Sequence, residues 1–196
     1  MDQNLQNEIL NTSIELFRTK GLKFTMLEVA NAMHVAKKTI YKLYPSKEDL
    51  LMDMVVTGFA RIQESKREIL NSDLPMKEKI SRVLIAMPDE YATLDFRNLK
   101  GIEIKYPEVW KAISQNLDSE WEPIYELLEE GMRLGVVRKI SLPVLKQIVT
   151  SSIDSFLYTD GLKRSGILYQ DALHALVEIL MKGVWNDSAE QSLGIQ

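Results

Sequence analysis

Residues 25–45 contain the signals that most constrain how this chain can fold. Thr25 and Glu28 have the spacing of a capping box, in which each side chain accepts a hydrogen bond from the other residue's backbone N–H. A second short run of helical periodicity covers Lys37–Leu43, and Pro45 ends it because the residue before a proline avoids the helical region. Two short helices around a three-residue break are therefore predicted, the layout of a helix-turn-helix.

The rest of the chain repeats apolar residues at helical spacing and lacks the alternation typical of strands. We expect an all-α fold, with a small three-helix domain over residues 1–45 and a larger helical domain over residues 46–196. A glycine at position 21 should end the first helix. The helices predicted after residue 45 cover residues 47–70, 76–91 (kinked or shortened by Pro88), 94–105, 107–134, 142–159 and 169–185.

The composition excludes several classes of protein. The chain has no cysteine, so it can form neither disulfide bonds nor thiolate metal sites. The N-terminus lacks the basic start and apolar run of a signal peptide, and no stretch reaches the roughly 18 apolar residues of a membrane span. We therefore expect a cytoplasmic protein without a membrane partner.

Known catalytic patterns are not evident in the sequence. His34 and His174 each lack a second histidine at metal-ligand spacing, and a helical di-iron site would need two Glu-x-x-His motifs where this chain offers only Asp171-x-x-His174. The chain has no nucleophile elbow and no glycine-rich phosphate loop. We expect no enzyme, no metal site and no cofactor.

The second short helix carries groups that suit the major groove of DNA. From His34 to Lys47 there are four lysines and no acidic residue, although the formal net charge of the chain is −4. Lysine neutralises phosphate, threonine can touch a base edge, and a tyrosine hydroxyl can donate to phosphate. A charge run is also common on a solvated face, so the lysines alone decide little. The candidate groove residues are Lys37, Lys38, Thr39, Tyr41 and Lys42.

The pattern extends beyond these residues. Its most specific part consists of Thr25, Val29-Ala30, Val35, Lys37, Thr39-Ile40-Tyr41 and the run Tyr44-Pro-Ser-Lys-Glu-Asp-Leu-Leu51. With these residues, the segment 9–52 resembles the N-terminal domain of the tetracycline-repressor (TetR) family of bacterial regulators. The rest of the chain is similar to that family only in length and in its succession of helices.

The resemblance implies a transcription regulator, a repressor, that binds a pseudo-palindromic operator in double-stranded DNA as a homodimer. An unidentified small organic effector bound by the larger domain would release it. Thr25 would contact phosphate, residues 37–39 would face the major groove, and Tyr41 and Lys47 would hold the DNA backbone. Tyr41 has an alternative role, which is to pack against the helix that follows Pro45.

Four positions depart from the family's usual pattern. His34 and Ala36 stand where glycine and serine are usual, so we expect strain in the turn and a missing helix cap. Leu43 replaces a residue that commonly touches phosphate. Tyr44 replaces a phenylalanine, and we expect it to pack in the core. The missing cap at Ala36 and the lost contact at Leu43 keep open an alternative, a ligand-binding or protein-interaction module that does not bind an operator.

Large, adaptable side chains recur along the larger domain and suit an apolar effector cavity, although such residues also build ordinary cores. Asp154 is the polar exception, either a solvated or interface carboxylate or a counter-charge for a ligand. The candidate effector residues are Phe59, Met87, Tyr91, Trp110, Trp121, Tyr125, Asp154 and Phe156.

The last two helices carry apolar rows that could form a four-helix bundle across a two-fold axis. The resemblance places the dimer seam on the same helices. The candidate interface residues are Ile148, Ser152, Ser155, Leu173, Leu176, Val177 and Leu180.

Overall fold

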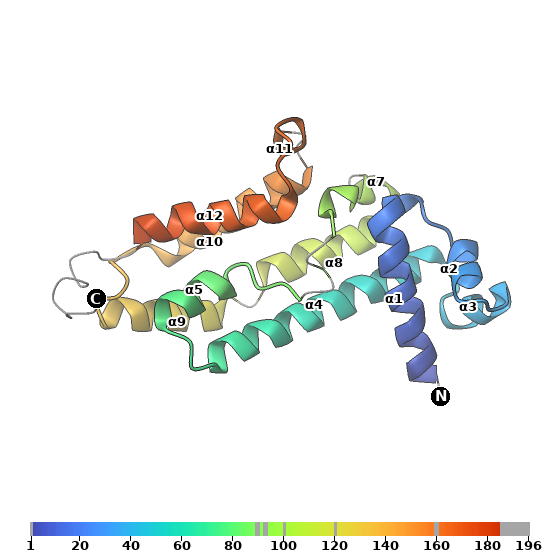
Figure 1. The fold of residues 1–196 in the computed structure, drawn as a ribbon, viewed down its shortest axis with the longest axis horizontal. Helices are drawn as coiled ribbons and strands as arrows, with labels where there is room; N and C mark the ends of the chain where they lie inside the picture. The colour runs from blue at the N-terminus through green and yellow to red at the C-terminus, as the bar shows by residue number, and fades with distance from the viewer. Residues whose placement is uncertain are drawn as a thin grey trace. The chain divides into compact units, whose positions relative to one another are not determined.

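The computed structural model describes residues 2–88, 91, 94–99, 101–119, 121–158 and 161–184, and this part of the chain is helical without any β-strand (Figure 1). The all-α prediction is confirmed. The first helices are α1 (Asp2–Lys20), the 3-10 helix η1 (Gly21–Lys23), α2 (Met26–Ala32), α3 (Lys37–Leu43), α4 (Lys47–Asn71) and α5 (Met76–Val83). They are followed by η2 (Phe96–Leu99), α7 (Ile102–Lys105), α8 (Pro107–Asp118), α9 (Glu122–Arg133), α10 (Leu142–Tyr158), α11 (Gly161–Arg164) and α12 (Tyr169–Val184).

The helices fall into two compact units. The first comprises Met1–Arg61 and Thr93–Asn116, and the second comprises Ile62–Ala92 and Leu117–Gln196. Helix α4 begins in the first unit and its last residues belong to the second. It is therefore a continuous backbone connection between the two.

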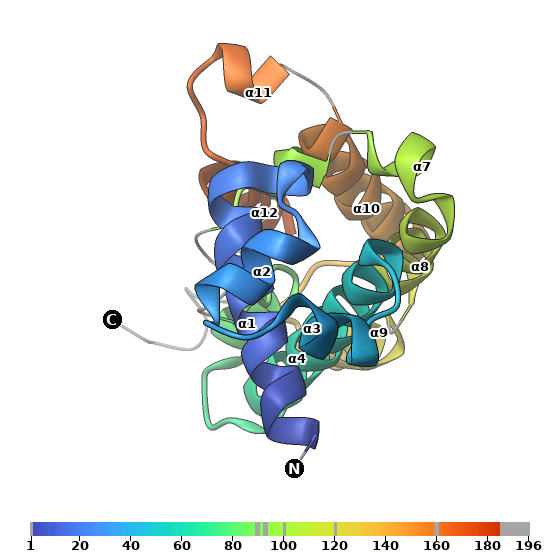
Figure 2. The same ribbon diagram turned by 90° about the vertical axis from the view of Figure 1, so that its right-hand side faces the viewer.

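In the first unit, α2 packs against both α1 and α3 (Figure 2). Phe17 of α1, Val29 of α2 and Ile40 of α3 are buried, as their spacing predicts. Burying each of these side chains contributes about 1.5–3 kcal/mol. The unit also includes η2, which packs on η1: a Cβ added to Gly21 (φ +55°) would lie 3.0 Å from the Cβ of Asn98. The tight approach and the positive φ both favour glycine at the end of α1.

In the second unit, α5 packs against α9, and α12 packs against both α5 and α10. Their inward faces form one apolar core. Its buried members are Ile80, Val83, Leu84, Trp121, Ile124, Leu128, Val137, Leu145, Val149, Val177 and Met181. No helix in the described ranges is long and apolar enough to cross a membrane.

The predicted helix over residues 107–134 is wrong, because two helices, α8 and α9, occupy that range. Pro123 lies in the first turn of α9, and Trp121 is its N-cap. Proline has no N–H and its ring clashes with the preceding turn, so it is tolerated only where a helix starts. Gly135 (φ +75°) follows the end of α9, and glycine adopts this left-handed conformation more readily than other residues.

Two other predicted helices are shorter than expected. The one over residues 76–91 ends at Val83, before Pro88. The one over residues 94–105 consists of η2 and α7, because Gly101 adopts φ +87° between them. Near the C-terminus α10 and α12 match their predicted starts, whereas Thr159 and Trp185 lie outside the described residues.

Candidate nucleic-acid interface

The capping box at the start of α2 forms as predicted. The backbone N–H of Glu28 donates to Thr25 Oγ1 at 3.2 Å, and the backbone N–H of Thr25 donates to Glu28 Oε2 at 2.8 Å. Lys20 of α1 pairs with Glu28 at 2.6 Å, and this bond is the main cause that lowers the pKa of Glu28. Thr25 is exposed, and its hydroxyl also donates to Glu28 Oε2 at 3.0 Å, so a contact with phosphate would require the hydroxyl proton to turn away from Glu28.

The turn between α2 and α3 is held by its backbone. The N–H of Val35 donates to the carbonyl of Ala30 at 3.0 Å, and the N–H of His34 donates to that of Asn31 at 3.1 Å. This pair of bonds is a Schellman motif, which places the residue after the helix in the left-handed region. His34 has φ +56°, so the strain expected from the missing glycine is present.

Helix α3 turns one face inward and a basic face outward. Ile40 is fully buried, whereas Lys37, Lys38 and Lys42 are exposed and Thr39 is half-buried. Ala36 gives the helix no side-chain cap, as its sequence predicted. The short helix is therefore held by Ile40 and presents its cationic side chains to solvent.

Tyr41 lies on the outward face, with 38% of its surface exposed. The ammonium group of Lys37 lies 5.0 Å from the centre of its ring, within range of a cation–π interaction. This exposure favours the predicted contact with a DNA backbone over a purely structural role.

Lys47 opens α4, and its ammonium group lies against the loop that precedes α2. Its Nζ donates to the carbonyl of Leu22 at 2.6 Å and to that of Phe24, and lies 4.1 Å from the centre of the Phe24 ring. Burial, followed by the charge of Lys105, lowers the pKa of Lys47 to about 8. An ammonium group has three N–H donors, so these two bonds leave one for a phosphate.

Tyr44, the residue after α3, is buried with 4% of its surface exposed, which confirms its predicted place in the core. Its hydroxyl also donates to the carboxylate of Asp53 on α4. The sequence did not indicate Asp53. The one signal in the sequence is that helical periodicity places this acidic residue on the inner side of α4.

Residues 9–54 match the family of bacterial regulatory proteins described as the tetR family. The matched segment covers α2, α3 and the first turns of α4, the elements that present the basic face. This segment is a TetR-family DNA-binding domain. Its helix-turn-helix is therefore a DNA-binding element, as the resemblance implied.

Similar proteins extend the match over nearly the whole chain. An uncharacterised helix-turn-helix transcriptional regulator of Bacillus subtilis, YvaF, is 24% identical over 184 residues, which cover 93% of this chain and 97% of YvaF. The fatty acid degradation regulator FadR of Bacillus halodurans superposes with a TM-score of 0.68 at 18% identity, covering 91% and 95% of the two chains. FadR of Bacillus subtilis in complex with stearoyl-CoA gives a TM-score of 0.62 at 19% identity, covering 90% and 97%. These structures show that the chain has the same fold.

The candidate effector residues are divided between the two units. Phe59 and Trp110 belong to the first, and the other six belong to the second. Trp121 is in the core of the second unit, and its ring centre lies 6.1 Å from that of Tyr125. Partial burial raises the pKa of Asp154. In the described residues no group of three or more side chains could hold a metal ion.

The candidate dimer residues differ in their exposure. Leu173 and Val177 are buried inside the second unit, so they pack within the subunit. Ile148 on α10 is 43% exposed, and Ser152, Leu176 and Leu180 are half-buried. Ser155 is exposed.

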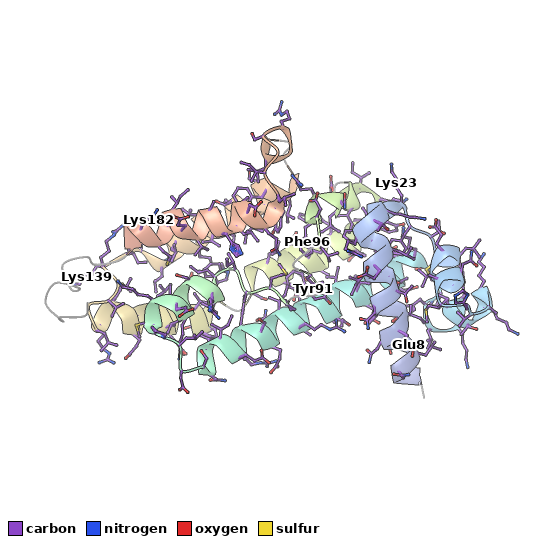
Figure 3. The ribbon with its side chains drawn as sticks, in the orientation of Figure 1. Glu8, Lys23, Tyr91, Phe96, Lys139 and Lys182 are labelled. Carbon is purple, nitrogen blue, oxygen red and sulfur yellow. The ribbon has the colours of Figure 1, made fainter. Side chains whose placement is uncertain are left out.

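Sequence reasoning missed two other apolar side chains of the same helices, Val144 on α10 and Ile179 on α12. Ile179 is 71% exposed. Lys182, which is labelled in Figure 3, lies one turn further along α12 and pairs with Glu178 at 2.6 Å, and both of these side chains are exposed. Val144 lies four residues before Ile148, and Ile179 lies three residues after Leu176. Helical spacing would therefore have placed each of them on the same helix face as a candidate interface residue.

Proposed function

We propose that the protein is a homodimeric repressor that binds a pseudo-palindromic operator through α3 and is released by a small organic effector. Residues 1–45 would act as the DNA-binding domain of a cytoplasmic regulator, and residues 46–196 as its effector-binding and dimerisation domain. The observation that carries the proposal is the anchoring of α3 by buried Ile40 beneath the exposed Lys37, Lys38 and Lys42. A fixed helix with a cationic outer face can enter the major groove as a rigid body.

A titration with DNA from the regions flanking the protein's own gene tests the proposal. A specific fragment should bind about a thousandfold or more tightly than random DNA at the same salt concentration. Equal affinity for all fragments, or no binding, would instead favour the helical module without an operator.

Operator affinity should fall as the pH rises above about 8. A phosphate beside Lys47 stabilises the ammonium form, so the pKa of Lys47 in the complex would lie above its value of about 8 in the free protein. Below that pH the ammonium is already formed, whereas above it binding must take up a proton. The affinity then declines by up to about tenfold per pH unit for each Lys47 that binds phosphate.

Lys47→Arg is the matched variant for this pH dependence, because arginine stays charged throughout. Fluorescence anisotropy of labelled operator at a series of pH values should give a flatter profile for the arginine variant than for the wild type. Equal slopes for the two proteins would show that Lys47 does not bind phosphate.

The effector proposed here has a long apolar chain. This class is suggested by the Bacillus subtilis FadR structure, which contains stearoyl-CoA and has the same fold over 90% of this chain. The second unit supplies a half-buried Tyr125 beside Trp121, and such aromatic groups suit an apolar ligand.

Stearoyl-CoA should change the tryptophan fluorescence and lower operator affinity by about tenfold or more, a coupling of about 1.4 kcal/mol. Coenzyme A without its acyl chain is the control and should do neither. Binding of stearoyl-CoA without an effect on operator affinity would contradict the coupling, and absence of binding would contradict the ligand class.

A further inference from the structure

A hydrogen-bonded cluster centred on Asp53 joins three helices of the first unit. Asp53 lies on α4, and its Oδ2 accepts hydrogen bonds from the Tyr44 hydroxyl and, at 2.8 Å, from Nε2 of Gln6 on α1. Its Oδ1 accepts from the Thr57 hydroxyl at 3.4 Å. One carboxylate therefore links α1, the residue that ends α3, and α4.

Tyr44 is placed so that this link acts directly on the end of α3. It is the C-cap of that helix, and its backbone N–H donates to the carbonyl of Ile40 at 2.9 Å. Pro45 follows and restricts the backbone of Tyr44. Ser46 and Asp49 then cap α4 reciprocally, with N–H to side-chain oxygen distances of 3.1 and 2.9 Å. The chain between the two helices has little freedom, so a side-chain bond across it fixes their relative orientation.

The hydrogen bond between Tyr44 and Asp53 is also stronger than one between two neutral groups. Hydrogen bonds to a charged acceptor are roughly twice as strong as those between neutral groups, and partial burial shields this one from water. Burial and then the hydrogen bond to Asp53 raise the pKa of Tyr44 well above its usual range. The hydroxyl therefore remains a donor at any pH at which the protein functions.

We propose that Tyr44 and Asp53 are positioning residues for DNA recognition, because their hydrogen bond holds α3 in the orientation in which it reads the operator. The inference rests on the proposed recognition of an operator by α3. A phenylalanine at position 44 would fill the same space in the core but could not form the bond. The orientation of α3 thus depends on a specific polar contact to α4, in addition to apolar packing.

Tyr44→Phe removes only the hydroxyl and is the direct test. Operator affinity should fall about tenfold, whereas affinity for random DNA, which depends on charge alone, should stay within about twofold of the wild type. Circular dichroism must show a folded protein at the temperature of the titration. A merely structural role would lower the melting temperature and leave the ratio of specific to random affinity unchanged.

Two further variants complete the test. Asp53→Asn keeps an acceptor oxygen for Tyr44, so it should lose only about three- to fivefold in operator affinity. Thr57→Val removes the longest bond of the cluster and should stay within about twofold of the wild type.

The outcomes separate this inference from the proposed function. If the wild type binds a specific operator and Tyr44→Phe binds it equally well, the positioning role is wrong. If Tyr44→Phe does not fold, Asp53→Asn decides, and wild-type affinity in that variant would also overturn the role. If the wild type itself does not distinguish operator from random DNA, the proposed function fails first.

Discussion

Replacing Ile148 with aspartate should convert the protein from dimer to monomer. Ile148 is exposed on α10 and would be covered by the partner in the proposed four-helix seam. A carboxylate there would be buried without a counter-charge in both subunits, and an unpaired buried charge destabilises by about 3–5 kcal/mol. The dimer dissociation constant should rise by at least about a hundredfold. Operator affinity should fall with it, because a monomer binds a single half-site.

Sedimentation velocity measures this change, and Ile104→Asp provides the matched control. Ile104 is an isoleucine on α7 that is 84% exposed and belongs to the first unit, whereas α10 and α12 belong to the second. The control should remain dimeric. Because Ile148 and Ile104 are both exposed, neither substitution should unfold the subunit. A dimer that persists in Ile148→Asp would place the interface on other helices.

Thr39→Ala should weaken the operator complex without changing the affinity for random DNA. Thr39 lies in the first turn of α3, half-buried among exposed lysines, where its hydroxyl and methyl groups can touch base edges. Losing a base contact costs about 1–3 kcal/mol in each half-site, or about 2–6 kcal/mol for the dimer, so operator affinity should fall by about 30-fold to 25,000-fold.

Thr19→Ala is the control for this substitution. Thr19 is exposed on α1, and its hydroxyl donates to the Glu15 and Leu16 carbonyls of its own helix. Operator affinity should therefore stay within about twofold of the wild type. If Thr39→Ala weakens operator and random DNA equally, Thr39 contacts the backbone and the reading of bases must come from other residues.

The DNA-binding element could be predicted from the sequence almost residue by residue, because local signals determine it. The capping box at Thr25, the bounds of α3 and the cap at Ser46 all depend on residues within four positions of one another. The strain at His34 followed from the resemblance, because glycine is usual at that position in the family.

Features that depend on tertiary packing could not be predicted in this way. Tyr44 and Asp53 are separated by a turn and part of a helix, so their hydrogen bond depends on the angle between α3 and α4. Leu173 and Val177 have the spacing of an interface row, yet the same spacing buries them in the core of the subunit. Periodicity identifies an apolar face of a helix but does not show what covers it.

A methylation-protection footprint on the operator tests most directly whether α3 lies in the major groove. Dimethyl sulfate modifies guanine N7 in the major groove and adenine N3 in the minor groove. Guanine N7 should be protected in two blocks related by the operator's two-fold symmetry, with centres about one helical turn, or roughly 34–36 Å, apart. Protection confined to adenine N3, or no protected block at all, would contradict recognition by α3.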